Sequence, residues 1–171
     1  MTRRVAVRFA SIVALVIGAD QATKAAVRAG MEVGESVPLI ARVLSLTHVN
    51  NTGAAFGLFQ GSVPFFIVMA TAVLGAIAWV LWRDRGTSVL FTTSLSLIFG
   101  GAAGNLIDRA VAGRVTDFID VHIWPVFNVA DIALDVGVAL LILYIIVHRD
   151  EPAAADVEPA APETVLAGPE S

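Results

Sequence analysis

Two aspartates, Asp117 and Asp131, stand in the stretch from Gly113 to Gly137, and the second opens an apolar run that continues almost unbroken to Val147. An aspartate at the centre of a membrane helix costs roughly 2.5 to 3.5 kcal/mol, and less near a helix end, so carboxylates in such places are candidates for function. Two neighbouring aspartates share a proton, because both cannot ionise cheaply. The ionised one can then take a proton from water while the neutral one donates a proton, which suits acid–base hydrolysis.

The composition is that of an integral membrane protein. Of the 171 residues 57% are hydrophobic and only 15% are charged, whereas a soluble domain has about 25% charged residues. The length allows about four spans of roughly 20 residues with short connections. The sequence has no cysteine, which excludes disulfides and thiol catalysis. It also has no run of Lys and Arg, and therefore we expect no nucleic acid partner.

Long apolar runs predict four transmembrane helices. The first expected helix continues through Asp20 and Lys24, which lie four residues apart and can pair on one face. Two other interpretations stay open here: a cleaved signal peptide with a short apolar core, and an interfacial ion pair with the lysine extended towards water. The expected spans cover residues 1–29, 65–82, 89–107 and 128–147.

The connection between the first two spans differs from the rest. Val43 to Val49 alternates apolar and polar residues, as a half-buried strand does, and Asn50 to Gly53 is a turn signal. We interpret His48, on this strand, as a surface residue. The fold class is therefore an all-α polytopic membrane protein with a small extracytoplasmic β-subregion between helices 1 and 2. Residues 1–149 form the membrane domain, and the Ala-, Pro- and Glu-rich residues 150–171 form a disordered tail.

The third span is expected to pack closely against its neighbours. Gly100 and Gly104 form a GxxxG pattern of small residues, which lets helices approach. Asn105 and Arg109, at the end of this span, lie four residues apart and share a face.

Positive charge predicts the orientation. An even number of spans brings three arginine-bearing segments to one side, which we expect to be the cytoplasm. Both termini then lie in the cytoplasm, and a set of scattered polar residues meets near the outer membrane surface. These residues are Asn51, Asn105, Arg109, Asp117 and Asp131.

Spacing alone leaves other functions open. A small proton-coupled transporter using Asp20, Lys24 and Asp131 is comparable with a hydrolase, and a scaffold or lipid-binding protein without chemistry is the third alternative. A metal cluster can also be drawn, but its spacing matches no strong ligand pattern, so we expect no metal and no cofactor. Its members would be Asp117, Asp120, His122 and Asp131.

Five short motifs together resemble lipoprotein signal peptidase, also called signal peptidase II. They follow one another in the family's order and cover roughly residues 5 to 148. The motifs are Asp20-Gln21-Ala22-Thr23-Lys24, Asn51-Thr52-Gly53-Ala54-Ala55-Phe56, Gly101-Ala102-Ala103-Gly104-Asn105-Leu106-Ile107-Asp108-Arg109, Val115-Thr116-Asp117-Phe118 and Phe127-Asn128-Val129-Ala130-Asp131.

The resemblance implies a bacterial plasma-membrane aspartyl endopeptidase. It would act as a monomer among membrane lipids and remove the signal peptide of a diacylglyceryl-modified prolipoprotein, cleaving before the lipidated cysteine. Asp117 and Asp131 would be its catalytic pair, and Asp108 would have a structural role. The residues that would line or support the site are Asp20, Lys24, Asn51, Asn105, Arg109 and Asn128.

Asp135 departs from the family's usual pattern, in which this position is uncharged. It follows Asp131 by four residues and shares its helical face. Like-charge repulsion would disfavour ionisation of Asp131 if the two lie close together, or Asp135 finds a partner elsewhere. The sequence leaves both possibilities open.

Overall fold

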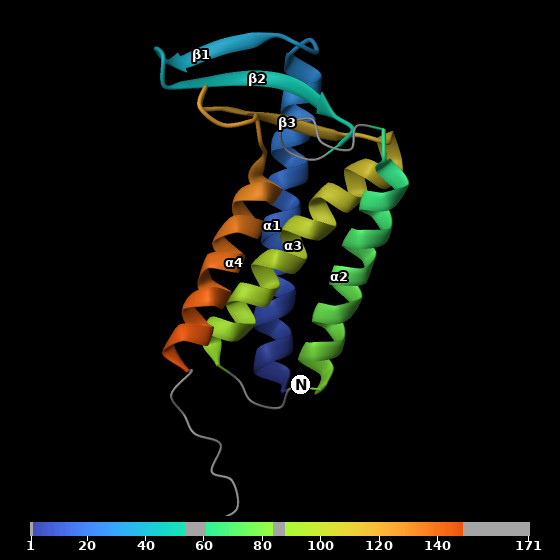
Figure 1. The fold of residues 1–171 in the computed structure, drawn as a ribbon, viewed down its shortest axis with the longest axis vertical. Coiled ribbons are helices and arrows are strands. Elements are labelled where there is room, and N and C mark those ends of the chain that lie inside the picture. Colours follow the sequence, from blue (N-terminus) through green and yellow to red (C-terminus); the bar gives the residue numbers. More distant parts are fainter. Residues whose placement is uncertain (1, 54–60, 84–87, 149–171) are drawn as a thin grey trace, which may run out of the picture.

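Four helices form the body of the protein. The computed structural model describes residues 2–53, 61–83 and 88–148. The helices run side by side, and a sheet lies across one end of them (Figure 1). All four are long and apolar enough to cross a membrane, which confirms the expected spans. They are α1 Arg3–Gly30, α2 Val63–Arg83, α3 Val89–Ala112 and α4 Val129–Val147.

The first helix is continuous through Asp20 and Lys24, as predicted. It begins after Thr2, whose hydroxyl accepts a hydrogen bond from the Val5 amide, and it ends where Met31 turns to extended backbone. The helix extends from the end of the bundle opposite the sheet to the sheet itself (Figure 1). Asp20 and Lys24 therefore lie at the level of the other motifs.

The sheet has three antiparallel strands in the order β1-β2-β3. Strands β1 (Ser36–Ile40) and β2 (Leu44–Asn51) come from the connection where the sequence predicts a strand. Strand β3 (Val115–Asp120) joins them from the connection between α3 and α4. Sequence reasoning missed β3 because its first four residues are all buried, which removes the alternation that marks a half-buried strand. Pairing places Asp117 opposite Val49, close to the end of β2.

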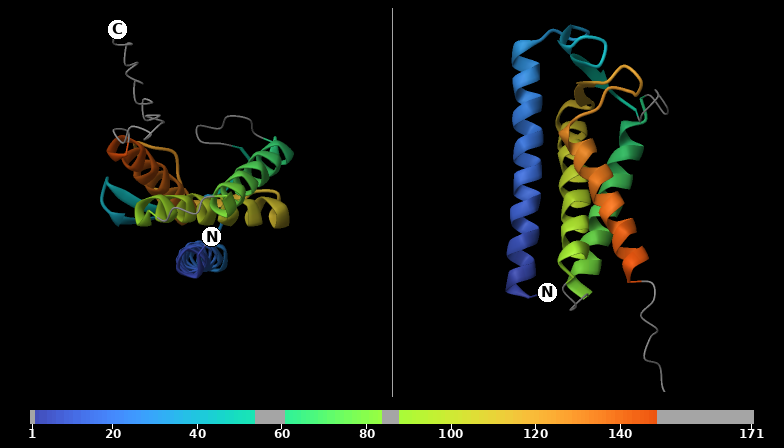
Figure 2. Two further views of the ribbon diagram at one scale, coloured as in Figure 1. Left: turned by 90° about the horizontal axis from the view of Figure 1, so that it is seen from below. Right: turned by 90° about the vertical axis from the view of Figure 1, so that its left-hand side faces the viewer.

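Small residues let α1 and α4 pack closely against α3, which confirms the expected close packing of the third span. A Cβ atom on Gly104 would lie 2.6 Å from Asp20 Oδ2, and one on Gly101 would collide with the carbonyl oxygen of Ala130. Figure 2 shows α1 along one side of α3, while α2 and α4 diverge on the other side. This arrangement brings polar residues of α1, α3 and α4 together below the sheet.

Two predicted features lie outside the described residues. One is the return to the membrane expected after Gly53, which falls in residues 54–60. The other is the tail from residue 150, so its disorder stays a prediction.

Candidate active site

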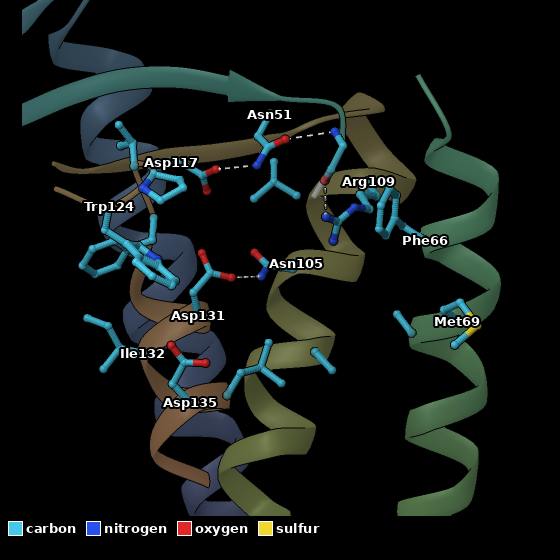
Figure 3. A pocket seen from close by; sticks show the side chains of 18 of the residues that line it. Asn51, Phe66, Met69, Asn105, Arg109, Asp117, Trp124, Asp131, Ile132 and Asp135 are labelled. Carbon is cyan, nitrogen blue, oxygen red and sulfur yellow. Dashed lines mark hydrogen bonds between the residues drawn. The ribbon is translucent and has the colours of Figure 1, made fainter. Parts of the chain in front are cut away.

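A cavity of about 640 Å³ opens between α2, α3 and α4, beneath the sheet. Asp117 and Asp131 both lie in its wall, together with Asn51, Asn105 and Arg109 (Figure 3). The structure thus gathers residues from the end of β2, from α3, from β3 and from α4, as the sequence predicts. Asn128 completes the set from behind, fully buried and outside the cavity lining.

Asp117 is held by two amide side chains. Its carboxylate, only 2% exposed, projects from the middle of β3. Asn51 Nδ2 donates a hydrogen bond to Oδ2 at 2.9 Å, and Asn128 Nδ2 donates one to Oδ1 at 2.7 Å. Asn51 itself is fixed because its Oδ1 accepts from the Gly53 amide at 2.9 Å. Each oxygen of Asp117 therefore has a defined donor.

Asp131 is held by the start of its own helix. Asn128 and Asp131 form a capping box: Asn128 Oδ1 accepts from the Asp131 amide at 3.1 Å, and Asp131 Oδ2 accepts from the Asn128 amide at 3.0 Å. Asn105 Nδ2 donates to the other oxygen at 2.8 Å. A helix N-terminus favours negative charge, so the start of α4 offsets part of the cost of a charged carboxylate at this buried position.

Asn128 links the two aspartates directly. Its Nδ2 donates to Asp117 and also to Asn105 Oδ1, at 3.1 Å, while its backbone amide donates to Asp131. No part of its surface is exposed. One side chain at the start of α4 therefore sets the relative position of both carboxylates.

The surroundings of Asp117 favour the neutral form of its carboxyl group. Burial raises its pKa from the ordinary value of 3.8 to about 6, because a charge is poorly solvated there. The hydrogen bond from Asn51 lowers the pKa, the nearby charge of Asp131 raises it, and the bond from Asn128 lowers it again. Its protonation equilibrium therefore lies much nearer to neutral pH than that of an ordinary aspartate.

Lys24 lies behind the aspartate pair and is completely buried. Its Nζ lies 2.9 Å from Asp20 Oδ2 and 3.2 Å from Asp108 Oδ2, and it donates to Asn105 Oδ1 at 2.9 Å. The alternative of an interfacial lysine extended towards water is therefore wrong. That alternative is reasonable from the sequence alone because lysine normally keeps its charge in water. In the structure, Asp108 and Asn105 of α3 bind the ammonium group together with Asp20.

The Lys24 cluster also ties the helices to the start of α4 and to β3. Asp20 Oδ1 accepts from the Ala130 amide at 3.0 Å, and Asp108 Oδ2 accepts from the Thr116 amide at 3.2 Å. Thr116 and Ala130 each neighbour one member of the aspartate pair. Charged side chains on α1 and α3 thus anchor the backbone that carries the site.

Sequence reasoning missed Gln21 as part of this cluster. Its Nε2 lies within hydrogen-bond distance of Asp20 Oδ2, the Gly104 carbonyl and Asp108 Oδ1, at 3.0 to 3.2 Å. The available signal was its place inside the first motif, between Asp20 and Lys24. The i, i+4 rule alone does not reveal it, because Gln21 is adjacent to Asp20 in the sequence and its other two partners lie on α3.

Arg109 connects three elements at the edge of the cavity. Its Nη2 donates to the Gly53 carbonyl at 3.2 Å, and its guanidinium stacks over the Phe66 ring of α2 at 4.9 Å. Its Nε is buried and has no partner among the described residues. Arg109 is therefore more than an interfacial anchor, because it faces the cavity that holds both aspartates.

The residues drawn as a metal cluster do not gather. Asp120 and His122 lie outside the cavity lining and contact each other, with His122 Nδ1 3.3 Å from Asp120 Oδ1. Asp120 also accepts from Thr47 at 3.0 Å, and His122 Nε2 lies 3.2 Å from Ser45 Oγ. These contacts join β2 to the segment after β3.

His48 is not a surface residue, contrary to the expectation. It is 4% exposed, and its Nδ1 lies 3.0 Å from the Met31 carbonyl at the end of α1. The register of β2 shifts between Leu46 and Val49, so strict alternation does not hold at this point. The bulge turns His48 inward, which a period of two cannot anticipate.

The chain is similar to known proteins over most of its length. The family model described as signal peptidase (SPase) II matches residues 12–147. A lipoprotein signal peptidase of Halothermothrix orenii is 46% identical over 134 residues, which is 78% of this chain and 92% of that protein. One from Desulforapulum autotrophicum is 39% identical over 158 residues, covering 87% of this chain and 98% of its own.

Solved structures show the same fold. A bacterial membrane enzyme solved at 2.3 Å resolution superposes with a TM-score of 0.81 at 33% identity, covering 88% of this chain and 94% of that one. A second, solved at 1.9 Å, has a TM-score of 0.75 at 34% identity, over 81% and 92% of the two chains. With four membrane-length helices and a family match over most of its length, this chain belongs to the signal peptidase II family of membrane peptidases.

Proposed function

We propose that this protein removes the signal peptide from diacylglyceryl-modified prolipoproteins, cleaving before the lipidated cysteine, with Asp117 and Asp131 as the catalytic pair. Family membership supports the removal of signal peptides from prolipoproteins. The observation that carries the catalytic assignment is the shared role of Asn128. This one residue donates to both carboxylates, in the wall of one cavity.

The chemistry follows from the different surroundings of the two aspartates. Asp131, at a helix N-terminus, takes a proton from a water molecule whose oxygen attacks the scissile carbonyl carbon. Asp117, whose pKa is raised to about 6, donates its proton to the carbonyl oxygen. When the tetrahedral intermediate collapses, one of its hydroxyl groups returns a proton to Asp117, the C–N bond breaks, and the leaving amine takes the proton held by Asp131. The pair ends with one shared proton, as it began.

The cavity fits a substrate that lies partly in lipid. Its end near the sheet is polar and holds Asn51, Asn105 and Arg109 beside the aspartates. Further along the helices the lining is apolar except for Asp135, with Met69 and Val73 of α2 among its residues. Acyl chains and the apolar signal segment can remain in this apolar part while the scissile bond reaches water and the aspartates.

The same proposal covers the setting of the enzyme. The end of the bundle opposite the sheet carries Arg3, Arg4, Arg8 and Arg83 (Figure 1), which supports a cytoplasmic position for that end and an outer position for the site. The protein then spans the bacterial plasma membrane with both termini inside. Each oxygen of Asp117 and Asp131 accepts a hydrogen bond from within this chain, so the aspartate pair can form in a monomer. Residues 1–149 act as the peptidase, and residues 150–171 are dispensable.

The test is cleavage of a diacylglyceryl-modified prolipoprotein by the purified protein in detergent, with the products identified by mass. Two controls run beside it: the same substrate without its lipid, and the Asp131→Asn variant. We expect one cut immediately before the lipidated cysteine, lost in both controls. Cleavage at another bond, or equal cleavage of the unlipidated substrate, would contradict the proposal.

A further inference from the structure

Asp135 has a carboxylate in the cavity wall and makes none of the hydrogen bonds that hold Asp117 and Asp131. It lies one helical turn beyond Asp131 on α4, lines the cavity and is exposed (Figure 3). Within the described part of the chain it makes no hydrogen bond or ion pair. Of the two possibilities left open by the sequence, a partner elsewhere is therefore not found among the described residues, and like-charge repulsion with Asp131 stays a prediction.

The surroundings of Asp135 cannot satisfy its charge. The cavity wall near it includes the apolar side chains of Ile132 on α4 and Met69 on α2 (Figure 3). A carboxylate in such a place needs a hydrogen-bond donor once a substrate displaces water from the cavity, because an unpaired charge among apolar groups is then costly. The donor must then come from whatever enters the cavity.

A signal peptide brings suitable donors. A peptidase needs the backbone around the scissile bond to be extended, and unwinding a helix inside a membrane leaves its backbone N–H groups without acceptors. Each unpaired N–H there is costly. An acceptor fixed in the cavity wall removes that penalty at one position.

The spacing on α4 indicates which position this is. Four helical residues span about 6 Å, and an extended peptide covers about 3.3 Å per residue. Asp135 lies on the membrane-centre side of Asp131, where the segment before the scissile bond must lie if the site faces outward. We propose that Asp135 is a substrate-binding residue whose carboxylate accepts a hydrogen bond from the backbone N–H about two residues before the scissile bond. This inference rests on the proposed function.

The first experiment compares Asp135→Asn with Asp135→Leu on a synthetic diacylglyceryl-modified peptide. The amide oxygen of Asn still accepts a hydrogen bond, so we expect a KM within about threefold of the unchanged protein. Leu has a similar size but accepts nothing, and KM should rise about tenfold, in line with a hydrogen bond to a charged group. Val136→Leu is the matched control, because Val136 is its exposed neighbour on α4 and does not line the cavity.

The second experiment identifies the N–H group. Substrates in which an ester oxygen replaces one backbone N–H, at each of the four positions before the scissile bond, are cleaved by the unchanged protein and by Asp135→Leu. We expect one position, near the second, at which the ester slows the unchanged protein about tenfold and leaves Asp135→Leu unaffected. This coupling does not depend on the absolute activity of the variant.

The outcomes separate the two proposals. If the unchanged protein fails to cleave the unmodified substrate, the proposed function fails. If it cleaves, but the ester effects are the same in both proteins at every position, the role of Asp135 is refuted. The role is also refuted if Asn and Leu act alike and both shift the pH profile, since that result would mean that Asp135 acts through its charge on Asp131.

Discussion

Two pairs of aspartates lie on either side of Asn105, and their surroundings differ sharply. Asp20 and Asp108 form a sealed pair outside the cavity lining, and both contact the ammonium group of Lys24. Asp117 and Asp131 border an open cavity and are bonded by neutral amide groups alone. Asn105 joins the pairs, because it accepts from Lys24 and donates to Asp131.

The difference explains why one residue type does two jobs. A carboxylate beside a buried cation is paired with it and fixes the backbone around it, as Asp20 does for Ala130. A carboxylate held only by neutral donors keeps its orientation and can still exchange a proton. The aspartates that contact the Lys24 ammonium group are therefore structural, and those that contact only neutral donors can react.

The largest expected effect comes from changing the cavity pair. Asp117→Asn and Asp131→Asn each remove a proton-transfer group, so cleavage should fall by about 10³- to 10⁴-fold. The double variant should be no worse than either single variant, because the two act as a unit. Cleavage kinetics measure this, and thermal unfolding in detergent checks that each variant is folded. Activity near that of the unchanged protein in either single variant would remove that residue from the pair.

The next effect is on stability and concerns the sealed pair. Lys24→Met leaves Asp20 and Asp108 without their buried cation and should lower the free energy of unfolding by about 3 to 5 kcal/mol. Arg28→Met is the matched control, because Arg28 is 42% exposed and lies 3.8 Å from Asp108 Oδ1. Its loss should be about 1 kcal/mol or less. Equal losses in denaturant unfolding of the two variants would show that the buried cation has no special role.

A smaller effect is expected where α1 meets α3. The added Cβ of Gly104→Ala would lie 2.6 Å from Asp20 Oδ2 and displace the Asp20 carboxylate from its contact with Lys24. We expect a cost of about 1 to 3 kcal/mol in the free energy of unfolding. Gly75→Ala in α2 meets nothing within 4 Å, and alanine favours a helix over glycine, so it should be neutral or slightly stabilising. Thermal unfolding distinguishes them, and a neutral Gly104→Ala would show that the helices do not need this close approach.

The smallest effect is a shift in pH dependence. The hydrogen bond from Asn51 lowers the pKa of Asp117 because it favours the charged form. In Asn51→Ala that pKa rises, Asp117 keeps its proton to higher pH, and the fall of kcat/KM on the alkaline side should move up by about one unit or less. Asn50→Ala, the neighbouring change on β2, is the control. A shift to lower pH would contradict the assigned role of this bond.

Much of this site could be predicted from sequence because its signals are local. The apolar runs that give the spans and the motifs around Asp117 and Asp131 lie within short stretches. The burial of Lys24, the inward turn of His48 and the recruitment of β3 could not be predicted in this way. Each depends on a distant segment. Residues of α3 bury Lys24, and a bulge in the pairing of β2 with β3 turns the side chain of His48 inward. Because the first four residues of β3 are all buried, its sequence lacks the alternation of a half-buried strand.

The transporter hypothesis also fails on geometry. It requires Asp20 and Lys24 to lie on a path through the membrane, whereas both are fully buried and outside the cavity lining. Their role as a buried ion pair is visible only once the helices are packed together.

The most direct test of the contrast is a titration of Asp117 by NMR, with ¹³C at the aspartate carboxyl carbons and Asp117→Asn to assign its signal. We expect a midpoint at about pH 6. In Asp131→Asn the midpoint should fall, because the charge of Asp131 raises the pKa of Asp117. A midpoint near the ordinary value of 3.8, or one that Asp131→Asn leaves unchanged, would contradict a proton-sharing pair.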